Sequence, residues 1–224
     1  MKFTFKIQSY QTDAVEAVCK AFQGQRYQEH SLYIRDLGMK QPIAMPANQQ
    51  MEFALPDRQI SLFEAEDDTG YRNASLTISD GQLLNNIRAI QQRSNIRQSG
   101  SLVKDVGVPA LDVEMETGTG KTYVYIKTMY ELHRRYGWGK FIIVVPSIAI
   151  REGVMKSFQM TEDHFMEQYG HKVRSFIYSS SDLHQLDTFS SGSGIHAMII
   201  NTQAFAASLK EGGRSKESRI IYDI

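Results

Sequence analysis

The sequence predicts an α/β protein, with a parallel, doubly wound sheet that carries helices on both faces. After residue 110, short apolar runs alternate with helical patterns, which is typical of strand–helix–strand units. Residues 141–145, FIIVV, form a continuous apolar run of the kind found in strands buried on both faces. A glycine-rich loop at 116–122 lies between a predicted strand and a predicted helix. The chain of 224 residues is long enough for one such domain and an appended segment.

Composition and charge narrow the function classes. The 25 basic and 25 acidic residues cancel, so any nucleic acid must be bound by local groups rather than by bulk positive charge. A single cysteine, Cys19, excludes an internal disulfide and a multi-cysteine zinc site, and it fits a reducing cytoplasm. No apolar run approaches the roughly 18 residues of a membrane span, so we expect no membrane partner.

The first 23 residues form the first predicted unit, a strand and a helix. Residues 3–7 alternate apolar and polar side chains, which predicts a short strand. Residues 10–22 carry apolar side chains at helical spacing, and Ser9 or Thr12 could cap this helix. The face of the helix is formed by Ala14, Val15, Val18 and Phe22.

Residues 24–109 form the second predicted unit, a loop-rich insert. Prolines and polar runs interrupt residues 24–75, where only short strands at 51–55 and 59–63 are expected. Ser79 opens a capping-box pattern, so a helix should follow it. The apolar face of that helix is formed by Leu83, Leu84, Ile87 and Ile90.

Residues 110–224 form the third predicted unit, the sheet domain. A strand at 111–115 should precede the glycine loop, and a helix at 121–136 should end at Gly137 and Gly139. The predicted elements that follow are strands at 141–145, 172–178 and 195–200 and helices at 148–158, 181–189 and 203–209.

The glycine loop has the chemistry of a phosphate-binding loop. Its glycines let backbone N–H groups turn inward toward phosphate oxygens, and the following helix adds its positive N-terminus. Lys121 would reach the β- and γ-phosphates, and the Thr122 hydroxyl would bind Mg²⁺. The pattern departs from the full motif because Met115 stands at the first glycine position. The other residues expected to hold the nucleotide are Thr117, Gly118, Thr119 and Gly120.

A loop that lacks the first glycine but keeps TGTGKT resembles motif I of superfamily 2 helicases and translocases. The sequence resembles, more specifically, the restriction (Res) subunit of type III restriction–modification enzymes. This resemblance implies a RecA-like P-loop fold, ATP and Mg²⁺ as cofactors, and double-stranded DNA and a methylation (Mod) subunit as partners. The stretches that carry it are FKIQSYQTDAV at 5–15, METGTGKTY at 115–123, VPSIAIREGV at 145–154 and INTQAF at 200–205.

The resemblance also assigns roles to residues outside the loop. Gln11 would read adenine, because its amide offers the donor and the acceptor that the N7 and N6 edge requires; a surface glutamine is the alternative. Phe5 or Tyr10 could pack beside the base. Four residues that follow two buried strands would contact the DNA backbone, although helix capping by Ser147 and Thr202 is the alternative. These residues are Pro146, Ser147, Asn201 and Thr202. Arg151 and Lys156 could add positive charge, or could be solvated.

The acidic pair that a motor needs is not found after a hydrophobic strand, and Asp223 is a weak candidate for the metal-side acid. The chain is therefore interpreted as an N-terminal part of a larger enzyme, which binds nucleotide but neither hydrolyses it nor cuts DNA alone. Three alternatives stay open: a motor of a type I restriction enzyme or a repair helicase, a non-catalytic nucleotide-binding module, and a P-loop kinase of small metabolites.

Overall fold

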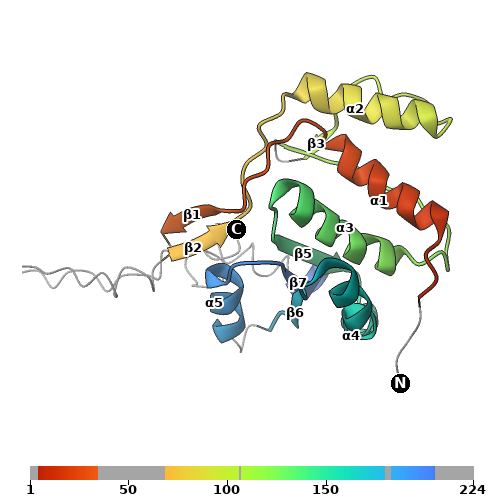
Figure 1. Cartoon of the computed structure of the whole chain (residues 1–224). Coiled ribbons are helices and arrows are strands. Elements are labelled where there is room, and N and C mark those ends of the chain that lie inside the picture. The colour runs from red at the N-terminus through yellow and green to blue at the C-terminus, as the bar shows by residue number, and fades with distance from the viewer. Residues whose placement is uncertain (1–4, 35–68, 106, 180–182, 205–224) are drawn as a thin grey trace, which may run out of the picture.

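The computed structural model describes residues 5–34, 69–105, 107–179 and 183–204. Its centre is a three-stranded parallel sheet, which confirms the predicted α/β class (Figure 1). The strand order is β5 (Lys140–Val145), β7 (His196–Asn201), β6 (Arg174–Ile177). β7 is in register with both neighbours, and its first five residues are buried.

Helices cover both faces of this sheet. Ala197 and Ile199 of β7 pack with α3 (Lys121–Tyr136) and α4 (Ile148–Tyr169). Met198 and Ile200 pack with α5 (Leu183–Ser191) instead. Because successive side chains of a strand point to opposite faces, α5 covers the face opposite α3 and α4. The doubly wound arrangement is therefore present in the described part of the sheet.

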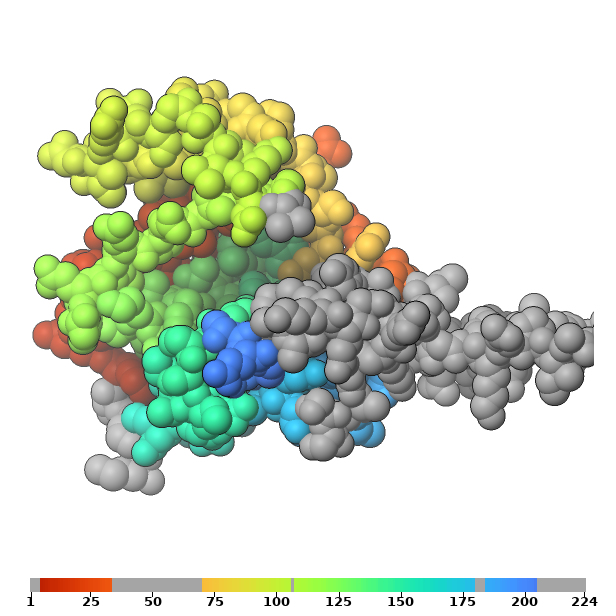
Figure 2. Space-filling model, turned by 180° about the vertical axis from the view of Figure 1, so that it is seen from behind, coloured from red at the N-terminus to blue at the C-terminus, as the bar shows by residue number. Residues whose placement is uncertain are grey.

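Two further helices extend the molecule away from the sheet. In Figure 1, α2 (Asp80–Arg93), α1 (Ser9–Ala21) and α3 lie side by side in that order. Figure 2 shows the yellow-green residues of α2 at one end of the molecule and the teal to blue sheet domain at the other. Val15 and Cys19 of α1 pack against Val124 of α3 and are buried. α1 is therefore the layer that joins α2 to the sheet domain.

The predicted caps of these helices meet different outcomes. Ser79 caps α2, since its hydroxyl accepts a hydrogen bond from the backbone N–H of Gln82 at 3.2 Å. The cap expected for α1 is wrong: the N-cap residue is Gln8, and no side chain caps this end. Thr12 lies inside the helix, where its hydroxyl donates to the carbonyl of Gln8. The Thr12 hydroxyl therefore bonds to a backbone carbonyl of the first turn and does not cap the helix.

The strand predicted at 111–115 does not form, although the glycine loop and α3 follow as expected. Asp112, Val113 and Glu114 are exposed. Side chains of a strand alternate between the two faces of a sheet, so Asp112 and Glu114 would both point to the same face. In a sheet with helices on both faces these two carboxylates would be buried, which is costly. The strand predicted at 3–7 also fails over residues 5–7, and residues 1–4 lie outside the described part.

The insert forms two antiparallel pairs that differ from the predicted strands. β1 (Ser31–Ile34) pairs with β2 (Thr69–Arg72), and β3 (Lys104–Asp105) pairs with β4 (Val108–Pro109). The strands predicted at 51–55 and 59–63 lie outside the described residues, as does most of the helix predicted at 203–209. The three predicted units of the chain stay a prediction.

α4 is longer than the predicted helix at 148–158, because it continues to Tyr169. The added turns place Phe165 and Tyr169 against Tyr130 of α3, with ring centroids 4.9 and 4.8 Å from the Tyr130 ring. This aromatic packing stabilises the second half of the helix. Among the described helices, none is both long and apolar enough to span a membrane.

His196 predicts a pH dependence of stability. Burial, with Lys140 and Arg174 nearby, lowers the pKa of His196 to about 4, and its Nε2 lies 3.1 Å from the carbonyl of Ser193. Between pH 4 and the ordinary value near 6.5 the unfolded chain binds the proton more readily, so stability should fall as pH falls through this range. We expect a loss of about 2–3 kcal/mol in the free energy of unfolding that is absent in His196→Gln. Urea titrations of both proteins at pH 7, 6, 5 and 4 measure the free energy of unfolding. If it fell with pH by the same amount in the wild type and in His196→Gln, the prediction would be contradicted.

Candidate nucleotide site and strand ends

The glycine loop turns directly into the N-terminus of α3. Gly118 and Gly120 both have left-handed backbone conformations, with φ of 82° and 86°. The hydroxyl of Thr119 donates to the carbonyl of Glu116 at 2.6 Å and tightens the turn. No side chain caps α3, so its first N–H groups are available to an anion. The loop therefore has the backbone cradle that a phosphate requires.

Lys121 already lies over this cradle. Its Nζ donates to the carbonyls of Met115 at 2.6 Å and Glu116 at 2.8 Å, and the side chain is exposed. Thr122 follows in the first turn of α3 and is partly buried. In the described part, no three His, Cys, Asp or Glu side chains form a metal site.

Gln11 meets the loop although 108 residues separate it from Thr119. Its Nε2 donates to the carbonyl of Thr119 at 2.9 Å. A Cβ placed on Gly120 would lie 2.6 Å from this nitrogen, so the glycine is needed for the contact as well as for its backbone angle. One amide N–H and the Oε1 of Gln11 are left over, which is what adenine recognition uses.

Aromatic side chains flank the start of α3. The ring of Phe5 stacks on Tyr123, with centroids 6.0 Å apart and an interplanar angle of 24°. The hydroxyl of Tyr123 lies 3.0 Å from Nε2 of His164, a histidine to which the sequence assigned no role. Tyr10 is 47% exposed. Of the two aromatic candidates, Phe5 is thus the one held beside the residues that follow the loop.

The structure brings the two strand ends together. Asn201 pairs with Val145 across β5 and β7, so Pro146 and Thr202 follow neighbouring strands at the same edge of the sheet. The capping alternative holds for Ser147, whose hydroxyl accepts from the N–H of Ile150 at 3.3 Å. At the second strand end the acceptor is Asn201 rather than the expected Thr202: Asn201 Oδ1 accepts from the N–H of Ala204 at 3.3 Å. Thr202 is exposed. Arg151 contacts Glu152 at 3.2 Å.

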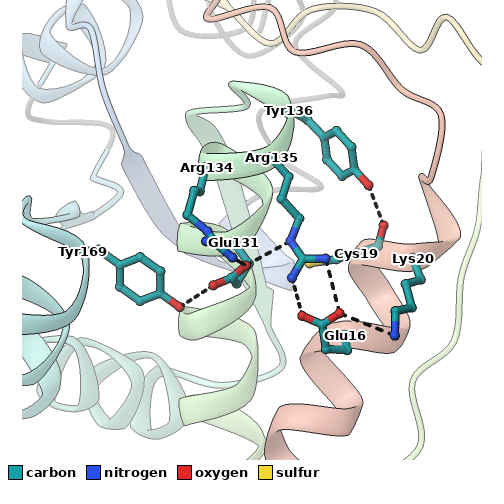
Figure 3. Close-up of polar contacts among 8 residues, drawn as sticks. All are labelled: Glu16, Cys19, Lys20, Glu131, Arg134, Arg135, Tyr136 and Tyr169. Atoms are coloured by element: carbon teal, nitrogen blue, oxygen red, sulfur yellow. Dashed lines mark hydrogen bonds and ion pairs between the residues drawn. The ribbon is translucent and has the colours of Figure 1, made fainter.

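A polar network that the sequence analysis missed joins three helices (Figure 3). At its centre, the carboxylate of Glu131 on α3 is 7% exposed. It accepts hydrogen bonds from Arg134 at 2.6 Å, Arg135 at 3.0 Å and the Tyr169 hydroxyl of α4 at 2.8 Å. Burial alone would raise the pKa of Glu131, but these bonds outweigh burial and lower it. The carboxylate is therefore held ionised.

Arg135 carries the network on to α1. Its guanidinium contacts both carboxylate oxygens of Glu16, one through Nη1 at 3.3 Å and the other through Nη2. The hydroxyl of Tyr136, the next residue of α3, donates to the carbonyl of Cys19, which lies three residues after Glu16 on α1, at 2.8 Å. The bond from Arg135 is the largest cause that lowers the pKa of Glu16. α1 is thus tied to the C-terminal end of α3 as well as to the loop before it.

Comparison with known proteins identifies the family. Residues 80–223 match the family described as type III restriction enzyme, res subunit. The chain is 36% identical over 110 residues to the Res subunit of EcoP15I from Escherichia coli, and 33% identical over 110 residues to that of EcoPI from Escherichia phage P1. Each match covers 48% of this chain and 11% of the relative.

The StyLTI Res subunit from Salmonella typhimurium is 52% identical over 61 residues, which is 26% of this chain and 6% of that protein. The matched regions therefore span about a tenth or less of the length of these relatives. The match to residues 80–223 includes the glycine loop, α3 and both strand ends. The chain belongs to the family of type III restriction enzyme Res subunits.

Proposed function

We propose that this chain is the ATP-binding part of a type III restriction enzyme's Res subunit, which moves on DNA and cleaves it. The observation that carries the proposal is the contact between Gln11 and Thr119, because it joins a base-reading amide to a phosphate cradle across 108 residues. A helix N-terminus without a side-chain cap and two left-handed glycines support the same reading. The sheet would then be the first part of a RecA-like domain.

Each loop residue has a role in this proposal. The backbone of 117–120 binds the β- and γ-phosphates, and Lys121 exchanges its two carbonyl partners for phosphate oxygens. Thr122 would supply one ligand of Mg²⁺, which would neutralise negative charge on the phosphates. Gln11 binds the adenine edge, and Phe5 packs near the base. These interactions hold ATP without needing an acid from the rest of the chain.

The second part of the proposal concerns DNA and the protein partner. Pro146, Ser147, Asn201 and Thr202 would contact DNA phosphates, since they lie together at the carboxyl edge of the sheet, where α/β proteins bind ligands. The Mod subunit of the same system would recognise the site, and the complex would act in the cytoplasm. Acting alone, the 224 residues would bind nucleotide without turnover, because no acidic pair follows their buried strands.

Base preference tests the role of Gln11. The protein should bind ATP more tightly than GTP, and Gln11→Ala should reduce this preference by about 5–100-fold, because a paired amide contact is worth roughly 1–3 kcal/mol. Calorimetric titration with each nucleotide in the presence of Mg²⁺ measures the ratio. Gln8→Ala, one turn away, serves as the matched control. An unchanged ratio in Gln11→Ala would make Gln11 a structural residue of the loop.

DNA binding tests the strand ends. Thr202→Val removes an exposed hydroxyl without touching the caps made by Ser147 and Asn201, so the helices should keep their stability. We expect this variant to bind duplexes of different sequence with an affinity lowered by about 2–10-fold, uniformly across them. Fluorescence anisotropy with several labelled duplexes measures the effect. Equal affinity of wild type and variant would leave only the capping role at these strand ends.

The non-catalytic module is the competing function, and DNA-stimulated phosphate release separates the two. If the proposal holds, an intact Res subunit with its Mod partner should hydrolyse ATP, and its Lys121→Ala variant should not. If the chain is a non-catalytic module, neither protein should show DNA-stimulated ATP turnover. The two outcomes also show whether the nucleotide site serves a motor.

A further inference from the structure

We propose that Glu16, Arg135 and Glu131 are positioning residues of the nucleotide site, which fix α1 on α3 so that Gln11 meets the phosphate loop. This inference rests on the proposed nucleotide-binding function and names residues outside the loop that determine base preference. It follows from the polar contacts that join α1 to α3 and to the loop before it, and from the chemistry of the Arg135 guanidinium.

The apolar part of the α1–α3 interface does not by itself fix the register of the two helices. Its buried members are Val15, Cys19 and Val124, and the partly buried side chains packed against them are Ala14, Met115 and Leu132. The hydrophobic effect that drives this packing is non-directional, so it opposes a small shift of one helix along the other less sharply than a hydrogen bond does. A directional contact is needed to hold Gln11 within hydrogen-bond distance of Thr119.

Arg135 supplies this direction, next to the hydrogen bond from the Tyr136 hydroxyl to the carbonyl of Cys19. Its planar guanidinium contacts Glu16 through two nitrogens and Glu131 through Nε, so three donors in one fixed fork are used. Glu131 cannot swing away, because it is 7% exposed and also accepts from Tyr169 of α4. Figure 3 shows Arg135 between the two carboxylates, with Glu16 on α1 pointing toward α3.

The position of Glu16 along α1 links this fork to the base-reading amide. Glu16 lies five residues after Gln11, a rise of about 7.5 Å along the helix. A shift or rotation that broke the Glu16 contact would also move Gln11 from the carbonyl of Thr119, which is 2.9 Å away. Helices behave as rigid elements over this length, so the fork sets the place of the amide.

The test measures base preference in the 224-residue chain. Glu16→Gln should lower the affinity for ATP by about 3–10-fold and leave GTP unchanged, so that the ATP-to-GTP ratio falls. Arg135→Lys keeps the charge but loses the fork, and it should behave like Glu16→Gln. Arg134→Gln is the matched control, because Arg134 binds Glu131 without contacting α1. Its ATP-to-GTP ratio should equal that of the wild type.

A double-mutant cycle separates positioning from general loss of stability. If Glu16 acts through Gln11, Glu16→Gln should have no further effect on the ratio in a Gln11→Ala background. Additive losses, or a wild-type ratio in Glu16→Gln, would overturn the inference. Amide hydrogen exchange of residues 116–122 without nucleotide gives an independent readout: it should quicken in Glu16→Gln and not in Arg134→Gln. If the wild type bound no ATP, the proposed function would fail, and this exchange result would still decide the inference.

Discussion

Replacing Lys121 by alanine is expected to abolish measurable binding of ATP with Mg²⁺. In the proposed site the ammonium would be the side-chain charge that the loop presents to the phosphates; without nucleotide it donates to the carbonyls of Met115 and Glu116. A charge-assisted hydrogen bond is worth about 1.5–3 kcal/mol, and Lys121 would make more than one, so the loss should exceed about a hundredfold. Calorimetric titration of both proteins measures it.

Lys104→Ala is the control for this prediction. Lys104 is, like Lys121, an exposed lysine with a short polar contact, since its Nζ lies 2.5 Å from Asp80, but it belongs to β3 and not to the loop. Its loss should leave ATP affinity unchanged. Equal ATP affinity in the wild type and in Lys121→Ala would remove the phosphate-loop role of 116–122.

The sheet domain was predictable where local signals and tertiary packing agree. The bounds of α3 follow from Gly120 and Gly137, because both adopt left-handed conformations that stop a helix. The apolar run of β5 predicted a strand buried on both faces. The strand forms, but it lies at an edge of the described sheet, where Val144 is 43% exposed, and the buried central strand is β7. The strand expected at 111–115 failed because its pattern alternates acidic and apolar side chains, and a doubly covered sheet has no solvated face for them.

The insert was not predictable for a different reason. β1 and β2 pair across more than thirty intervening residues, and neither strand has an apolar alternation that distinguishes it from its neighbours. Asn73 adds a long-range contact: its side chain accepts from the N–H groups of Gly139 and Lys140 and donates to the carbonyl of Lys140. Such pairings depend on the folded sheet domain, which a local pattern does not contain.

In the nucleotide site, too, local motifs were predictable from the sequence and long-range contacts were not. The glycine loop is a local motif, and the role assigned to Gln11 came from a family resemblance rather than from its surroundings. The structure adds the bond from Gln11 to Thr119. The ion network was missed because Glu131 with Arg134 and Arg135 is spaced like an ordinary pair on an exposed helix face. Only the packing of α1 and α4 on α3 makes that carboxylate buried.

The buried position of Glu131 also has a consequence for stability. Glu131→Ala removes the acceptor of Arg134, Arg135 and Tyr169 at once. Breaking a buried ion pair costs about 3–5 kcal/mol, but Arg134 is 60% exposed and Arg135 keeps Glu16, so we expect about 2–4 kcal/mol. For a chain of this size, that corresponds to a midpoint lowered by roughly 5–15 °C.

Urea and thermal unfolding, followed by circular dichroism, measure this loss against Glu162→Ala. Glu162 pairs with Lys172 at 2.7 Å but is 42% exposed, so its removal should cost no more than about 1 kcal/mol. Acid provides a second check. Because the pKa of Glu131 is lowered in the folded chain, its contribution is complete above the ordinary value near 4.3 and is lost as pH falls through the folded-state value. The difference in unfolding free energy between wild type and Glu131→Ala should therefore shrink in strong acid. If Glu131→Ala lost no more stability at pH 7 than Glu162→Ala does, the network would not stabilise the three helices.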